Sequence, residues 1–186
     1  MSINSVAKEH YSAGVISYTR WRADASGHLD AAIEADANFA LPKLVKAWVL
    51  QGARDTTFTQ PISDLVKDFE RCMPATQGRE QDLLAALQLA RAGKGIESAT
   101  ALESILHKNP TDLLVHQLLH ESLFWLGQFD WMRDVIEKAT PAWDETSADY
   151  DPFLALRAFA NEEAGYLEDA ERFGFSNVPD RAAYKR

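Results

Sequence analysis

Two histidines and a glutamate come closest, in this sequence, to a catalytic or metal-binding pattern. His116 and His120 stand four residues apart, which places both on one face of a helix, the spacing of helical zinc sites. Glu121 follows the pair instead of lying between the histidines, where metalloproteases carry their catalytic base. The sequence marks no third ligand. The pattern therefore favours hydrogen-bonded core histidines over metal ligands, and His116 and His120 stay weak metal candidates.

Other catalytic patterns are missing from the sequence. The segment Gly93-Lys94-Gly95 lies between two expected helices instead of coming after a strand, so it does not predict a phosphate loop. No Gly-x-Ser-x-Gly motif is present. Cys72 is the single cysteine, and a structural, partly buried thiol is favoured over a nucleophile. We therefore assign no catalytic residue, expect no metal and no cofactor, and favour a protein without enzymatic activity.

Apolar residues recur at helical spacing along almost the whole chain, and no run alternates as a strand would. The fold class expected is all-α, built of antiparallel helix pairs. Asp24 to Gly27 is expected to break the first two helices apart, and Gly52 to Gln60 to form a loop. The expected helices span residues 6–21, 28–35, 40–51, 61–73, 79–92, 96–107, 113–126, 128–140, 152–164 and 166–173.

Three glycines at the expected turns suggest a repeat. Gly93 and Gly127 lie 34 residues apart, the period of the tetratricopeptide repeat, and Gly165 comes 38 residues later. This spacing predicts a tetratricopeptide-like α-solenoid, although an irregular helical bundle with a coincidental period would also fit. The expected organisation is a single domain over residues 1–175 with a polar tail at 176–186. Its repeat units span residues 5–52, 61–92, 93–127 and 128–174.

The order of features resembles the tetratricopeptide repeat protein 38 family. The resemblance rests on Tyr18 and Trp21, Asp36 with Phe39, Arg79-Glu80, Asn109 to Asp112, the run His120 to Gly127, Met132-Arg133-Asp134 and Trp143. It covers nearly all of this chain but only the N-terminal part of the family's pattern, which continues into more helix pairs. Lys43 departs from the family, which tends to have histidine there. The resemblance implies a solenoid scaffold and carries over no catalytic residue.

In such solenoids the first helix of each pair lines a concave face, and counting from the turn glycines assigns residues to that face. The candidate binding residues are Arg91, Gln117, Glu121, Phe124, Trp125, Phe159 and Glu162. This aromatic and acidic set could hold a basic or amphipathic peptide, with Trp125 as anchor. Alternatively, Phe124 and Trp125 belong to the core and the glutamates form a solvated face.

The charge balance narrows the partners. The formal net charge is −9, with 46% hydrophobic residues. Nucleic acid is an unsuitable partner, because phosphate binding requires clustered Lys and Arg, and an anionic membrane surface is disfavoured for the same reason. The N-terminus lacks a signal peptide's pattern, and no apolar run reaches the roughly 18 residues of a membrane span. The expected location is the cytoplasm.

Three functions are open on the sequence alone. The leading hypothesis is a scaffold that binds a protein or peptide on its concave face. The second is a small-molecule or metal-dependent enzyme or binder, with a pocket near His120, Glu121 and Trp125. The third is self-association, as a homodimer through an open C-terminal end or as a fragment of a longer solenoid, because Leu167 and its apolar neighbours lack an expected cap.

Overall fold

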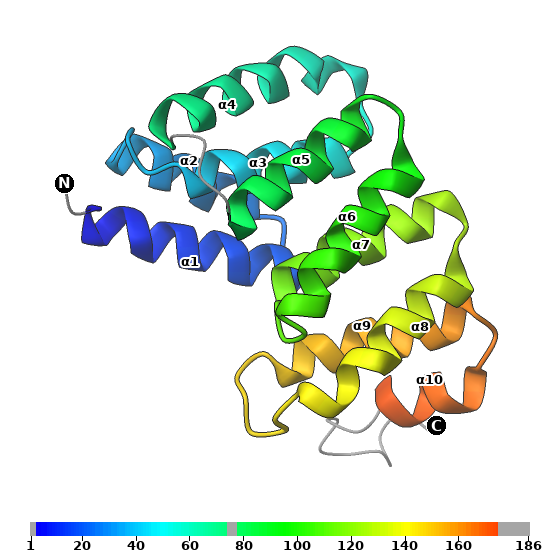
Figure 1. The fold of residues 1–186 in the computed structure, drawn as a ribbon. Coiled ribbons are helices and arrows are strands. Elements are labelled where there is room, and N and C mark those ends of the chain that lie inside the picture. The colour runs from blue at the N-terminus through cyan, green and yellow to red at the C-terminus, as the bar shows by residue number, and fades with distance from the viewer. Residues whose placement is uncertain (1–2, 74–77, 175–186) are drawn as a thin grey trace. The chain divides into compact units, whose positions relative to one another are not determined.

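The structure is a computed structural model that describes residues 3–73 and 78–174. Over these residues the chain is all-helical, with ten α-helices and no strand, which confirms the all-α prediction (Figure 1). The expected polar tail at 176–186 lies outside the described residues. The chain divides into two compact units, Met1–Ile105 and Leu106–Arg186.

The first unit holds six helices, the last of which extends just past its boundary. They are α1 (Ser5–Thr19), α2 (Ala25–Ala35), α3 (Leu41–Gly52), α4 (Thr59–Cys72), α5 (Arg79–Arg91) and α6 (Gly95–Lys108), with the short 3-10 helix η1 (Thr56–Phe58) before α4. Helix α3 is central, because it packs against α1, α2, α4 and α5. Trp48 on α3 donates a hydrogen bond from Nε1 to the carbonyl oxygen of Leu83 on α5 at 3.2 Å.

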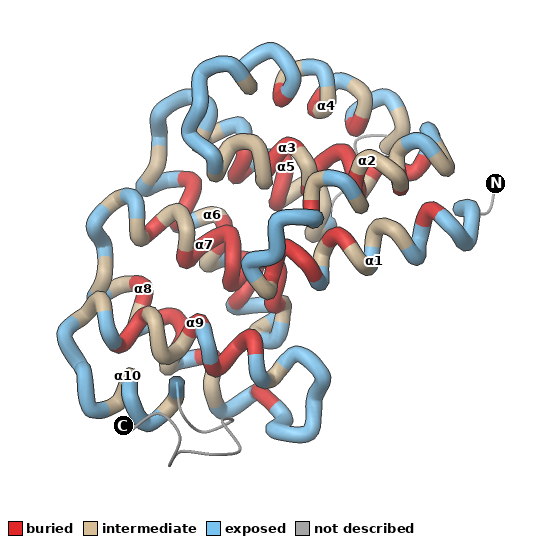
Figure 2. Tube along the Cα trace, turned by 180° about the vertical axis from the view of Figure 1, so that it is seen from behind, coloured by how far each residue is buried: buried red, intermediate tan, exposed pale blue. Residues whose placement is uncertain are grey.

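The second unit contains α7 (Leu113–Leu126), α8 (Phe129–Ala139), the 3-10 helix η2 (Thr140–Ala142), α9 (Tyr150–Glu163) and α10 (Leu167–Gly174). Helices α7, α8 and α9 pack against one another, and α10 folds back on α9. The largest buried apolar side chains of this unit come from all three packed helices, and Figure 2 shows the buried stretches along them. They are Leu119, Leu123, Met132, Ile136 and Phe153.

The three turn glycines end their helices in the same way. Gly93, Gly127 and Gly165 all have left-handed backbone, with φ of 74°, 66° and 85°. In each turn the N–H of the residue after glycine bonds the carbonyl five residues back, the Schellman arrangement. The pairs are Lys94 to Leu89 at 3.0 Å, Gln128 to Leu123 at 2.9 Å and Tyr166 to Asn161 at 2.8 Å. The turns predicted at these three glycines are therefore present in the structure.

The predicted break at Asp24 to Gly27 is largely wrong, because Ala25, Ser26 and Gly27 form the first turn of α2. Close packing explains the difference. A Cβ atom on Gly14 of α1 would lie 3.0 Å from the Leu29 side chain and 3.4 Å from the Ala25 carbonyl oxygen, so α1 and α2 approach closely here. Tertiary packing thus overrides the weak helix propensity of the Ala-Ser-Gly run. Similarly, the expected loop 52–60 includes η1 and the start of α4.

A polar network links α8 to α9 in the second unit. Arg157 on α9 donates to Glu137 on α8 from Nε at 2.9 Å and from Nη2 at 2.6 Å. Asn161 donates to the same carboxylate at 3.0 Å and accepts from Arg133 at 2.9 Å. Burial opposes the charge of Glu137, but the hydrogen bonds from Arg157 and Asn161 outweigh it and hold the pKa of this carboxyl below its ordinary value. Arg133 and Arg157 also lie over the rings of Tyr166 and Phe173.

Substituting Gly93 with Ala should lower the free energy of unfolding by about 1–2 kcal/mol, because an L side chain is strained in left-handed backbone. Gly27→Ala is the matched control, since a Cβ at either position meets nothing within 4 Å. Gly27 lies inside α2, so this substitution should stabilise by about 0.5–1 kcal/mol. Urea titration measures the change in the free energy of unfolding for both variants, which should be opposite in sign. Equal changes would contradict the role assigned to the turn at Gly93.

Substituting Glu137 with Ala should destabilise the second unit by about 2–4 kcal/mol, because it leaves the largely buried Arg157 guanidinium without its bidentate partner. The control is Asp169→Ala, which removes an exposed pair with Arg172 and should cost at most about 0.5 kcal/mol. Denaturant unfolding followed by circular dichroism measures both. A loss at Glu137 no larger than that of the control would show that the network adds nothing to stability.

Candidate functional site

Helix α7 carries most of the residues singled out in the sequence. The carboxylate of Asp112 accepts a hydrogen bond from the Val115 N–H at 3.2 Å and so caps the start of the helix. Every residue from Leu113 to His120 is buried. His116 and Gln117 are 0% exposed and His120 is 1% exposed. The polar residues of this half of α7 are therefore interior groups.

Each histidine is tied to a backbone carbonyl through one ring nitrogen. Nε2 of His116 lies 2.9 Å from the carbonyl oxygen of Pro110, and Nδ1 of His120 lies 2.9 Å from that of His116. A carbonyl oxygen only accepts, so both of these nitrogens carry hydrogen. The remaining nitrogens, Nδ1 of His116 and Nε2 of His120, are lone-pair acceptors without a hydrogen-bond partner within the described chain.

The electrostatics keep both rings neutral. Burial lowers the pKa of His116 below its ordinary value of 6.5 and outweighs the hydrogen bond to Pro110 and the charge of Asp112. Burial is also the main cause for His120, reinforced by the neighbouring His116, and lowers the pKa of His120 to about 3.

Aromatic rings pack against His116. The centroid of His116 lies 6.3 Å from that of His120, 6.2 Å from Trp143 and 5.6 Å from Phe153, and the last two rings stack at 4.3 Å. Residues 3–73 and 78–174 contain no group of three His, Cys, Asp or Glu side chains that could hold a metal ion. The observed contacts are those of hydrogen-bonded core histidines.

The expected binding residues of α7 and α9 form a partly exposed aromatic cluster. The Phe124 ring lies 5.5 Å from Trp125, 5.5 Å from Phe159 and 6.1 Å from Phe129, measured between centroids. Phe124 and Phe159 are half-buried, whereas Trp125 is 56% exposed. Phe159 comes from α9 and Phe129 from α8, so this cluster, which we call the aromatic platform, joins three helices.

Carboxylates flank the platform, but two expected members lie elsewhere. Glu162 on α9 is exposed, and Glu121 on α7 is half-buried and accepts a hydrogen bond from Gln117 at 3.0 Å. Gln117 is fully buried and offers no surface to a ligand. Arg91 belongs to the first unit, where its Nη2 lies 2.6 Å from the Ser63 hydroxyl.

His120 and Trp125 lie on different sides of α7. The two residues are five positions apart, which separates them by about 140° around a helix. His120 is 1% exposed and Trp125 is 56% exposed. The buried histidines and the exposed tryptophan are thus two separate features of α7.

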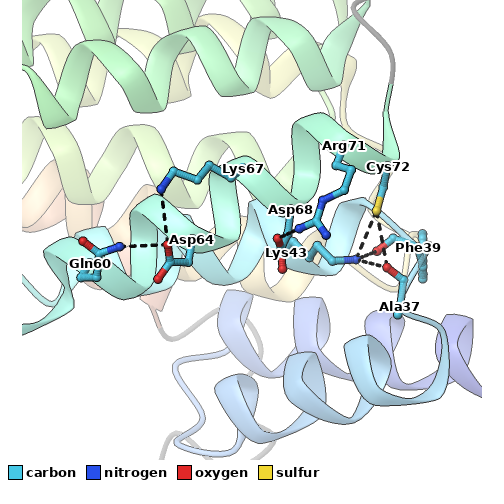
Figure 3. A network of polar contacts seen from close by, with 9 residues as sticks. All are labelled: Ala37, Phe39, Lys43, Gln60, Asp64, Lys67, Asp68, Arg71 and Cys72. Atoms are coloured by element: carbon cyan, nitrogen blue, oxygen red, sulfur yellow. Dashed lines mark hydrogen bonds and ion pairs between the residues drawn. The ribbon is translucent and has the colours of Figure 1, made fainter.

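Sequence reasoning missed a third polar cluster, which lies in the first unit. Lys43 on α3 is 2% exposed, and its Nζ contacts the carbonyl oxygens of Ala37 at 2.5 Å and Phe39 at 3.1 Å. The Cys72 sulfur at the end of α4 lies 3.7 Å from the same nitrogen (Figure 3). A signal existed, because Lys43 lies between Pro42 and Leu44, at a position where helical spacing already indicates burial.

Comparison with known proteins adds no constraint on this site. No protein-family model matches the chain, and no solved structure matches it. The resemblance to the tetratricopeptide repeat protein 38 family therefore stays a prediction. Among the helices of the described residues, none is long and apolar enough to cross a membrane.

Acid should destabilise the second unit through its buried histidines. An unfolded histidine binds a proton below its ordinary pKa of 6.5, whereas the depressed pKa keeps the folded ring neutral. The stability is therefore complete above this pH and is lost as the pH falls, by about 2 kcal/mol for His120 between about pH 7 and pH 5, and His116 adds to this loss. Urea titrations across this range measure the slope.

His120→Gln should make that slope clearly shallower, whatever its effect on stability at neutral pH. His107→Gln is the control, because it makes the same substitution at an exposed histidine of the second unit. A wild-type stability that stays flat down to about pH 5 would show that these rings protonate without unfolding.

Proposed function

We propose that this chain is a tetratricopeptide-like helical-repeat scaffold that binds a basic or amphipathic protein segment. The three identical glycine turns support a repeated hairpin unit, and hairpins of this kind stack into solenoids. In this proposal the aromatic platform around Trp125 is the docking point. The chain's single cysteine suits a reducing compartment such as the cytoplasm.

The observation that carries the proposal is the exposure of Trp125 on a supported aromatic base. A tryptophan that leaves 56% of its surface in water forgoes burial energy that a partner could recover. Trp125 contacts the ring of Phe124, which in turn contacts Phe159, so its position requires little ordering upon binding. Exposed, preorganised tryptophans are the usual anchors of protein interfaces.

Charge specifies the kind of partner. Glu162 is exposed beside Phe159, Glu121 lies one helical turn from Trp125, and the whole chain carries a net charge of −9. These charges attract a cationic segment and repel an acidic one. An amphipathic peptide could place an apolar side chain on the platform and its Lys or Arg residues near the carboxylates.

Peptide display against the purified protein tests this function. We expect enrichment of peptides that combine Lys or Arg with a large apolar residue, and Trp125→Ala should weaken their binding about tenfold or more. The matched control is Trp21→Ala, because Trp21 is 67% exposed but lies in the first unit. Binding should fall with added salt, because part of the attraction is electrostatic.

Three results would contradict the proposal. One is that no peptide class is enriched, and another is that Trp125→Ala binds the enriched peptides as the wild type does. The third is that Trp21→Ala weakens binding as much as Trp125→Ala, because a general loss of structure would then explain both. Circular dichroism of each variant separates misfolding from a local loss of contact.

Self-association through the C-terminal helix is the second candidate. Helix α10 has no buried residue, Leu167 is 65% exposed and Tyr166 is 47% exposed. Light scattering of the wild type and of Leu167→Glu over a range of concentrations tests it. A dimer that the substitution dissociates would support this candidate, and a monomer at all concentrations would remove it.

A further inference from the structure

The pair formed by Lys43 and Cys72 carries an inference independent of the proposed binding function. Its nitrogen and sulfur lie 3.7 Å apart, on helices α3 and α4 of the first unit. Lys43 is 2% exposed, whereas Cys72 is half-buried and so within reach of a small solute. An accessible sulfur thus lies against a lysine amine that solvent cannot reach.

The position of Lys43 is fixed by the backbone. Its Nζ contacts the carbonyl oxygens of Ala37 and Phe39, in the loop between α2 and α3, and these two contacts aim the remaining donor at the Cys72 sulfur. All three contacts are therefore made to groups that carry no formal negative charge while the thiol is protonated. Figure 3 shows dashed lines from the amine to the sulfur and to the two carbonyl oxygens, and from the sulfur to the Ala37 oxygen, to which the thiol donates at 3.4 Å.

The number of cysteines determines which products oxidation can give. A hydroperoxide converts a thiol to a sulfenic acid, which normally condenses with a second thiol to form a disulfide. Cys72 is the only cysteine of the chain, so no intramolecular disulfide can form. Lys43 supplies instead the adjacent nucleophile, since sulfenic acids also condense with nitrogen to give sulfenamides.

We propose that Lys43 and Cys72 form a peroxide-responsive site, in which oxidation of Cys72 leads to a covalent sulfur–nitrogen bond with Lys43. In the first step the sulfur attacks hydrogen peroxide, an S–O bond forms, the O–O bond breaks, and water leaves. The sulfur is oxidised by two electrons and the peroxide is reduced.

In the second step the sulfenic acid loses its proton to solvent, and the ammonium then transfers a proton to the sulfenate oxygen, which leaves a neutral amine beside a sulfenic acid. The amine nitrogen attacks the sulfur, the S–O bond breaks, and the oxygen leaves as water with a second proton from the nitrogen. The protein has then lost two hydrogen atoms relative to the reduced form. Two equivalents of a small thiol reverse the reaction, because they return the thiol and the amine and become a disulfide.

The bond would clamp α3 to α4. The two residues are 29 positions apart in sequence, so the bond closes a long loop and restricts the unfolded chain as a disulfide does. The oxidised first unit should therefore unfold at a higher temperature than the reduced unit. The change is reversible and depends on peroxide, which are the properties of a redox switch.

Peptide mass mapping of the full chain after treatment with hydrogen peroxide tests the proposal. The expected product is a cross-linked peptide pair containing Lys43 and Cys72, lighter by two hydrogen atoms, which disappears upon treatment with dithiothreitol. Cys72→Ser should give no cross-link. This variant also serves as the control for oxygen that peroxide adds to the three methionines. The melting temperature should rise upon oxidation in the wild type only.

Lys43→Arg separates the cross-link from simple oxidation, because it keeps the buried charge but removes the primary amine. In this variant Cys72 should stop at a sulfenic acid that dimedone labels, or continue to a sulfinic acid. If the wild type instead gives only these oxygen-bearing products, the proposal is wrong. It is also wrong if Cys72 of the folded wild type does not react with peroxide, and both outcomes are measured on the wild type alone.

Discussion

A polar group that is buried without a hydrogen-bond partner costs free energy, and the ways in which this chain meets that cost shape both of its units. The interior side chains repeatedly serve main-chain carbonyls. Trp48 donates to Leu83, Ser98 to Ala86, and His116 to Pro110. Each such bond satisfies a side chain and fixes the approach of two segments, so the buried polar residues act mainly as positioning elements.

The same constraint accounts for the contacts of the two histidines of α7. Their hydrogen-bonded nitrogens are bound to carbonyls, and their remaining nitrogens are buried without a partner in the described chain, where a proton is costly. The exposed end of the same helix has the opposite character. There Trp125 leaves much of its ring in water, which suits it to recognition rather than to stability. The N-terminal half of α7 is thus buried, and its C-terminal end is exposed.

Helix positions could be predicted from the sequence because they depend on local signals. Apolar spacing located the helices, and the three glycines marked turns that need left-handed backbone. The break at Asp24 to Gly27 failed because a long-range contact, the approach of Leu29 to Gly14, decides that segment. Counting along α7 likewise assigned Gln117 to a binding face, yet the side chain is fully buried, because periodicity does not say how many sides of a helix are covered.

The polar clusters escaped prediction because only the packing of one helix on another brings their members together. Glu137 meets Arg157 at a sequence separation of 20 residues, and Lys43 meets Cys72 at a separation of 29. Lys43 also shows how a structural solution can create chemistry. The carbonyl oxygens of Ala37 and Phe39 accept two hydrogen bonds from the buried Lys43 amine. The third N–H of the amine is left to donate to the sulfur of Cys72, the single cysteine of the chain. The reactivity proposed for Lys43 and Cys72 therefore follows from the hydrogen bonds that a buried lysine requires. It needs no further adaptation of the fold.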